Sequence, residues 1–151
     1  MVKPSIKSNC FILLCIFAYC LVLSGCNDSS NSGIIIKDAR LYMPLEGSDM
    51  AAGYLRLENH QLKEINISSI ECKKVKASLH ETAIDLAGMI KMKKLELFSV
   101  GPESHVNFIP GGMHIMFSGL KEFKESVLMC AFLSTSGIEI PFVFEVRTNE
   151  K

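Results

Sequence analysis

The chain has 151 residues, enough for one domain, and its 16 basic and 16 acidic side chains balance to a formal charge of zero. Residues 1–25 contain two lysines and no acid, so their removal leaves 14 basic and 16 acidic residues and a formal charge of −2. A weakly acidic domain offers no basic patch to phosphates, which excludes nucleic-acid binding as a function class.

The N-terminal segment has the features of a bacterial lipoprotein signal. Two lysines precede thirteen apolar residues, 11–23, a length that suits a signal peptide better than a membrane span. The run LSGC at residues 23–26 follows and resembles a lipobox, in which cleavage leaves the cysteine as the lipidated N-terminus. We therefore expect a signal peptide over residues 1–25, a lipid on Cys26 and a flexible tether over residues 26–33. The alternative is an uncleaved N-terminal anchor.

The remainder, residues 34–151, has the pattern of a β domain. Its clearest alternation lies at residues 51–57, where Tyr54 and Arg56 oppose Leu55 and Leu57. We expect a strand from residue 34, strands at 51–57, 90–100, 105–109, 113–117, 127–134 and 138–146, and one or two strands within 65–79. Turn signals or polar links separate them, including a connection over residues 82–88. Seven or more short antiparallel strands without an amphipathic helix predict an all-β sandwich.

One of these strands carries side chains suited to a soft metal ion. If residues 113–117 form a strand, its period of two places His114 and Met116 on one face. Neutral imidazole and thioether together favour Cu(I) over hard cations. A hydrogen bond in the core would also satisfy a histidine in an apolar strand, so the spacing alone leaves both interpretations open.

The order of several motifs resembles the periplasmic copper chaperone family of the PCuAC type, which serves the CuA centre of cytochrome oxidase. The motifs are His80-Glu81-Thr82, Gly88-Met89-Ile90-Lys91-Met92, Pro110-Gly111-Gly112-Met113-His114-Ile115-Met116 and Gly119-Leu120. The family's signature is a histidine, ten residues, a methionine, twenty-one residues and then His-x-Met. Here twenty-one residues separate Met92 from His114, but eleven separate His80 from Met92. We expect the extra residue in the connection at residues 85–88.

The resemblance implies a cupredoxin-like β-sandwich and a function. The copper ligands that it implies are His80, Met92, His114 and Met116, with Met89 as the rival to Met92. With the lipobox at Cys26, we expect a monomeric copper chaperone, lipid-anchored on the periplasmic side of a bacterial membrane. It binds one Cu(I) and passes it to an oxidase subunit or assembly protein.

No catalytic motif of the form Gly-x-Ser-x-Gly, His-Glu-x-x-His or Cys-x-x-Cys is present, so we do not expect an enzyme. Two other interpretations remain open. One is a periplasmic copper sequestration and tolerance protein, and the other is a metal-free structural or interaction lipoprotein.

Two cysteines, Cys72 and Cys130, fall within the domain. In an oxidising compartment they suggest one disulfide, which would close a loop of nearly sixty residues. As free thiols either could bind or reduce copper, and Cys72, eight residues before His80, would lie nearer the site. The sequence leaves both states open.

Overall fold

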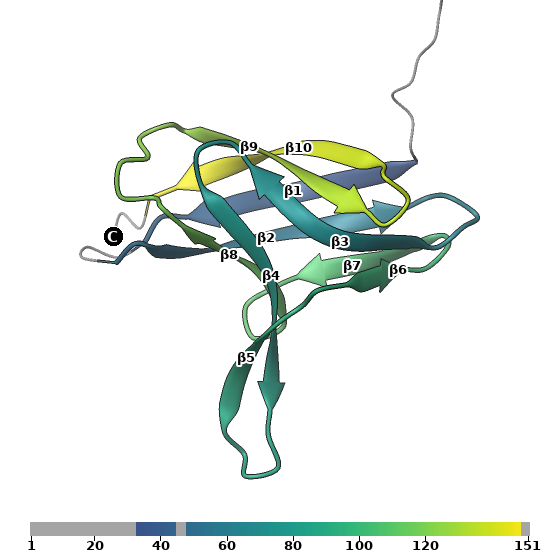
Figure 1. Cartoon of the computed structure of the whole chain (residues 1–151), viewed down its shortest axis with the longest axis horizontal. Coiled ribbons are helices and arrows are strands. Elements are labelled where there is room, and N and C mark those ends of the chain that lie inside the picture. Colours follow the sequence, from purple (N-terminus) through teal and green to yellow (C-terminus); the bar gives the residue numbers. More distant parts are fainter. Residues whose placement is uncertain (1–32, 45–47, 149–151) are drawn as a thin grey trace, which may run out of the picture. The chain divides into compact units, whose positions relative to one another are not determined.

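The structure of the protein is a computed structural model that describes residues 33–44 and 48–148. The expected signal peptide, Cys26 and all of the expected tether except Gly33 lie outside the described residues. No helix that could cross a membrane occurs in the described part. The strands, shown in Figure 1, are β1 (Ile34–Tyr42), β2 (Met50–Asn59), β3 (Ile65–Cys72), β4 (Lys76–Ile84), β5 (Ile90–Lys94), β6 (Phe98–Val100), β7 (Ser104–Phe108), β8 (Met113–Ser118), β9 (Val127–Ser134) and β10 (Glu139–Arg147).

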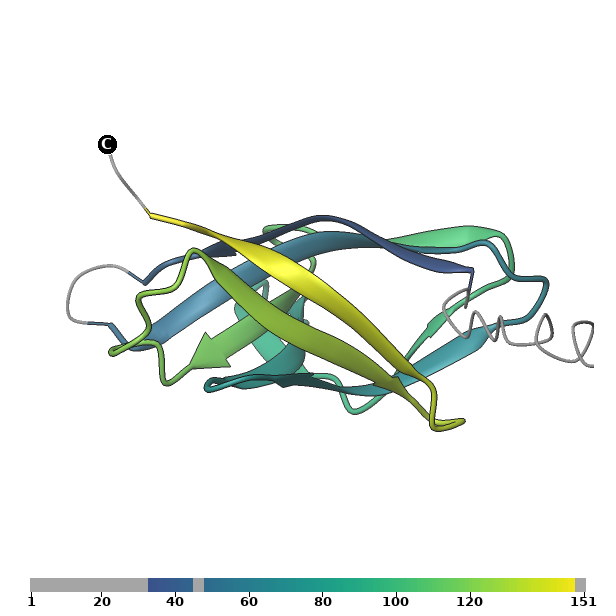
Figure 2. The ribbon, with the colours of Figure 1, turned by 90° about the horizontal axis from the view of Figure 1, so that it is seen from above.

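These strands form one continuous sheet in the order β5-β4-β8-β7-β2-β1-β10-β9-β3-β6, and β8 also pairs with β2. The sheet curls over so that one half covers the other (Figure 2). Two aromatic contacts cross the interior: Phe117 on β8 meets Phe144 on β10 with ring centroids 5.2 Å apart, and Phe108 on β7 meets Phe132 on β9 at 6.0 Å. The all-β sandwich expected from the sequence is therefore confirmed. Most strand pairs are antiparallel, but β1–β10 and β7–β8 are parallel.

The alternation expected within β2 and β8 is also present. On β2, Leu55 and Leu57 are buried in the core while Tyr54 and Arg56 lie on the outer, half-exposed face. On β8, Ile115 and Phe117 are fully buried in that core. By the same alternation, His114 and Met116 lie on the outer face of β8.

Two expected boundaries are wrong. The connection was expected from residue 82, but β4 continues to Ile84, so His80 lies inside a strand. The single strand expected at residues 90–100 is two strands, because β5 pairs with β4 whereas Phe98 and Val100 turn into the core beside β3. Residues 65–79, expected as one or two strands, contain β3 and the first part of β4.

Gly53 lies where two phenylalanines close over β2. A Cβ atom at this position would lie 2.6 Å from a ring carbon of Phe117 and 3.1 Å from one of Phe144. We expect Gly53→Ala to lower the free energy of unfolding by about 1–3 kcal/mol through overpacking, measured by urea denaturation. Gly101→Ala is the matched control, because its Cβ would meet nothing closer than 3.7 Å. An equal unfolding midpoint for the two variants would show that the rings move aside without cost.

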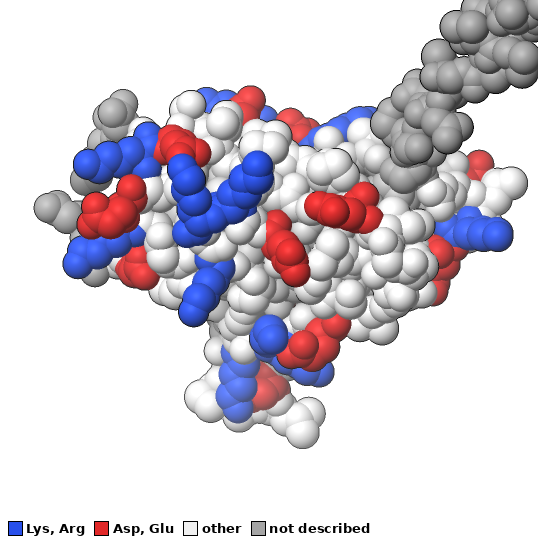
Figure 3. Space-filling view, turned by 45° about the horizontal axis from the view of Figure 1, so that its top comes forward, with Lys and Arg blue, Asp and Glu red and all other residues white. Residues whose placement is uncertain are grey.

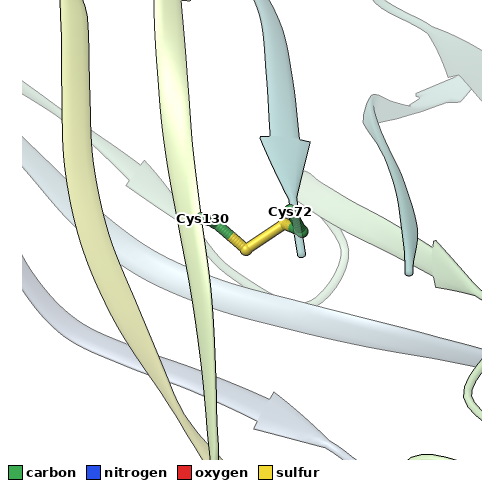
Figure 4. Close-up of a disulfide and its surroundings, with 2 residues drawn as sticks. All are labelled: Cys72 and Cys130. Atoms are coloured by element: carbon green, nitrogen blue, oxygen red, sulfur yellow. A yellow bond between two sulfur atoms is a disulfide. The ribbon is translucent and has the colours of Figure 1, made fainter. Parts of the chain in front are cut away.

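Cys72 and Cys130 form a disulfide (Figure 4). They are directly opposed in the antiparallel pair β3–β9, with their Cα atoms 4.0 Å apart. Of the two states that the sequence leaves open, the structure therefore contains the bridge, and neither cysteine presents a thiol to a metal.

Candidate metal centre

Two histidines from distant parts of the sequence lie side by side on the outer face of the sheet. His80 on β4 is directly opposite His114 on β8, and directly opposed residues of antiparallel strands point to the same face. Their ring centroids are 5.9 Å apart, with the planes inclined by 31°. His114 is buried and His80 half-buried, so the pair forms a partly enclosed surface site.

In each ring, one nitrogen lies within hydrogen-bond distance of the residue two positions earlier in the sequence. Nδ1 of His114 donates to the carbonyl oxygen of Gly112 at 2.9 Å, which leaves Nε2 of the neutral ring with a free lone pair. Nε2 of His80 lies 3.0 Å from Oγ of Ser78. Nδ1 of His80 is buried and has no hydrogen-bond partner within the described residues. A buried nitrogen without a partner costs about 1–3 kcal/mol, and a bound metal would remove that cost.

Met116 brings a thioether to the same face. It lies two residues after His114 on β8 and is half-buried between Ser78 on β4 and Ala52 on β2, which are its directly opposed neighbours. Both neighbours have small side chains, so the thioether is not covered by a bulky group from either strand. The arrangement of His114 and Met116 expected from strand alternation is thus present.

Met89 and Met92 both lie on the hairpin formed by β4 and β5. Met92 is directly opposite Thr82, which places it on the face of His80 and makes it a diagonal neighbour of that ring, within reach of a long side chain. Met89 closes the turn, where its carbonyl oxygen accepts the N–H of Asp85 at 2.9 Å. Met89 lies in the turn before β5 begins, and the pairing of β5 with β4 that places Met92 does not include it. The register therefore groups Met92, and not Met89, with the two histidines.

The environment of His80 keeps its imidazole neutral. Burial lowers the pKa of His80 below its ordinary value of 6.5, and positive charge on His114 and on Lys94 lowers it further. Neutral imidazole is the form that binds a metal, so this form persists to lower pH than in the unfolded chain. The unfolded chain takes up the proton first as pH falls. The metal-free fold therefore loses stability from about pH 6.5 downward, through the lowered pKa of His80.

Lys94 is directly opposite His80, which makes its contribution testable. We expect Lys94→Gln to raise the pKa of His80, because removal of a cation favours the imidazolium form. An NMR titration of the ring Cε1–H signal of His80 measures the change. Lys93→Gln is the matched control, because Lys93 lies opposite Glu81 on the other face of the hairpin. Equal titration shifts in the two variants would show that Lys94 has no specific effect.

The remaining histidines lie elsewhere. Nε2 of His60 is 3.0 Å from a carboxylate oxygen of Glu58, and His105 is exposed on β7. Glu58 is buried, and hydrogen bonds from Lys37, then His60 and Arg56, lower its pKa to about 2. This ion cluster was not foreseen from the sequence, and it gives His60 a structural partner.

The donors gathered on the outer face are two imidazoles and two thioethers. No group of three histidine, cysteine, aspartate or glutamate side chains that could hold a metal occurs within residues 33–44 and 48–148. Soft thioethers with neutral imidazoles match Cu(I) better than Zn²⁺ or the hard cations. Ser78, Gly112 and Lys94 were not identified from the sequence. Ser78 stands two residues before His80 on β4, which is the spacing of side chains that share a face of a strand.

Comparison with known proteins matches residues 34–126 to the family described as lipoprotein LpqE-like. No curated protein matches the chain. The copper-bound PCuAC domain from PmoF2 is 18% identical with a TM-score of 0.61, over 77% of this chain and 93% of that domain. The apo PCuAC domain from PmoF1 is 18% identical with a TM-score of 0.59, over 77% of this chain and 94% of that one.

A third solved structure has the same architecture. Apo-DR1885 from Deinococcus radiodurans is 18% identical with a TM-score of 0.59, over 80% of this chain and 82% of that one. At such identities the likeness concerns the fold. The chain has the cupredoxin-like β-sandwich of PCuAC domains, as the motif resemblance implies.

Proposed function

The chain belongs to the LpqE-like family of lipoproteins, and from this we propose that it is a copper chaperone outside the cytoplasm. It binds one Cu(I) through His80, Met92, His114 and Met116. The observation that carries the proposal is the register of β4 with β8 and β5, which groups these four side chains on one face. The match in fold to a copper-bound PCuAC domain adds support.

The donor set suits transport of copper better than electron transfer. Blue-copper centres use a thiolate ligand, whereas Cys72 and Cys130 are joined in a disulfide on β3 and β9. Two imidazoles and two thioethers are all neutral, so none holds Cu(I) by charge. Neutral ligands can be exchanged one at a time with those of an acceptor. A carrier needs such exchange, and no catalytic step is required of it.

Release of copper is favoured by the position of Met92. Its side chain is 65% exposed on β5, while His114 is 6% exposed on β8. Met92 is therefore the ligand that an acceptor reaches first, and His114 the one that leaves last. This asymmetry favours delivery over sequestration. The acceptor that we propose is a subunit or assembly protein of the CuA centre of cytochrome oxidase, with the carrier held by lipid on Cys26 at the periplasmic side of the membrane.

Copper titration tests the proposal directly. The protein, loaded with copper and ascorbate and challenged with a Cu(I) chelator, is expected to retain one equivalent of copper. X-ray absorption at the copper edge should show nitrogen and sulfur scatterers together. A protein that retains no copper against the chelator would favour the metal-free lipoprotein interpretation. A shell of nitrogen and oxygen alone would exclude the methionines as ligands.

A deletion strain separates delivery from tolerance. If the protein delivers copper, its loss should lower oxidase activity when copper is scarce, and added copper should restore that activity. Sensitivity that appears only at high copper, with normal oxidase activity, would instead identify a sequestration protein.

A further inference from the structure

β5 lies at one end of the strand order and, among the described residues, pairs only with β4. Hydrogen-bonded and non-hydrogen-bonded pairs alternate along antiparallel strands. The N–H of Leu95 bonds to the carbonyl of Leu79, and the carbonyl of Met89 to the N–H of Asp85. The backbone N–H and carbonyl groups of residues 91 and 93 therefore also point toward β4. The N–H and carbonyl groups of residues 90, 92 and 94 point to the free edge.

The hairpin that carries this edge projects from the sandwich (Figure 1) and has an apolar surface. All five residues of β5 are exposed. The large apolar side chains of the hairpin, each more than half exposed, are Ile84, Leu86, Met89, Ile90 and Met92. Exposed apolar side chains beside an unpaired strand edge are the kind of surface that another chain covers.

We propose that β5 is the docking edge for the copper acceptor, which adds an extended segment as a further strand. The segment carries carboxylates on the face of Lys91 and Lys93 and apolar or copper-ligating side chains on the face of Met92. This proposal rests on the copper function and names how the partner of that same site is recognised.

The lysines of β5 disfavour a second copy of this chain as the partner that pairs with its free edge. Lys91 and Lys93 share one face of β5, so two such edges paired antiparallel would set lysine against lysine, which is destabilising. Lys91 is paired with Asp85 at 2.9 Å, yet its side chain remains 62% exposed and can meet a further carboxylate. Lysine and acidic side chains both appear on the hairpin in Figure 3, beside an uncharged surface. An alternating acidic and apolar strand complements both features.

The position of the docking edge suits copper transfer. Side chains of an added strand become cross-strand neighbours of those on β5. A ligating side chain opposite Met92 would then stand beside the most exposed of the proposed copper ligands.

The test uses the copper-free chain and a synthetic end-capped peptide of alternating glutamate and valine with a central methionine. We expect the peptide to shift amide NMR signals of the β4–β5 hairpin. Ile90→Pro should weaken binding about tenfold, because proline removes an outward N–H without removing a bond to β4. Ile90→Thr, the matched control, keeps the N–H and should weaken binding less than about threefold. A peptide with lysine in place of glutamate should not bind.

Other outcomes would overturn the proposal. Shifts outside the hairpin, equal binding by the lysine peptide, or equal binding by the two Ile90 variants would each exclude strand addition at β5. Binding to phosphatidylglycerol vesicles that needs Leu86 and Ile90 would assign the hairpin to a membrane. A dimer abolished by Ile90→Pro in ultracentrifugation would assign the edge to a second copy.

Copper titration of Ile90→Pro keeps the two proposals separable. The variant should still bind one Cu(I), because Ile90 is not a ligand, and this result also verifies that the hairpin is folded. For the unsubstituted chain, peptide binding without copper binding would support the docking edge and contradict the copper function. Copper binding by the unsubstituted chain without peptide binding would contradict the docking edge and leave the copper function intact.

Discussion

The double substitution of His114 and Met116 by alanine is expected to abolish Cu(I) binding while the domain stays folded. The two side chains are adjacent on the outer face of β8, and their loss removes an imidazole and a thioether together. Removal of a residue that only orients a metal ligand typically lowers metal affinity about 10–100-fold. Removal of two ligands should lower the affinity for Cu(I) by more than that. Chelator competition measures the affinity, and near-ultraviolet circular dichroism measures the fold.

Two methionine variants sharpen this test. Met92→Ala should weaken copper binding, because the register places Met92 on the face of the histidines. Met89→Ala is the matched control, because Met89 has a similar exposure but lies in the turn, outside the pairing of β5 with β4. Unchanged copper stoichiometry in the double variant, or a stronger effect from Met89→Ala than from Met92→Ala, would contradict the proposed ligand set.

Removal of the disulfide should have the largest effect on stability. Cys72 and Cys130 are separated by 58 residues in sequence, and a cross-link of that span stabilises a fold by about 4 kcal/mol in the chain-entropy model. We expect Cys72→Ala with Cys130→Ala to lower the free energy of unfolding by that order, as measured by urea denaturation. In a domain of this size the melting temperature should fall by more than about 10 °C.

The copper site should survive this change. Neither β3 nor β9 carries a proposed ligand, so the double cysteine variant is expected to bind one Cu(I) while it remains folded. Ser69→Ala, on β3 with the bridge intact, serves as the matched control for stability. A cysteine variant as stable as the parent would show that the unfolded chain is already constrained there. Loss of copper binding by the folded variant would couple the bridge to the site.

The sequence predicted the shared face of His114 and Met116 within their strand better than it predicted the strand pairs. Alternation is local, so the burial of Leu55 and Leu57 and the shared face of His114 and Met116 follow from period two alone. β5 lacks such a signal, because all of its residues are exposed. Without that signal, residues 90–100 were expected as one strand, and β4 was expected to end before residue 82.

Partners across strands depend on contacts that no local pattern contains. His80 and His114 are 34 positions apart along the chain, and only the register of β4 with β8 makes them neighbours. The same holds for Lys94, which lowers the pKa of His80 from the opposite strand. Ser78 could have been foreseen, since it precedes His80 by two residues on the same strand.

The sequence by itself therefore determined the β class and the thioether beside His114, because hydrophobic alternation and residue chemistry are local properties. His80 and Met92 became candidate ligands through the order of motifs that resembles the PCuAC family. Only the tertiary structure decided the rest. It joined Cys72 to Cys130, set His80 opposite His114 and placed Met92, which we propose as a ligand, on the face of His80. These outcomes follow from strand register, whose free energy comes from packing and hydrogen bonds between residues far apart in the chain.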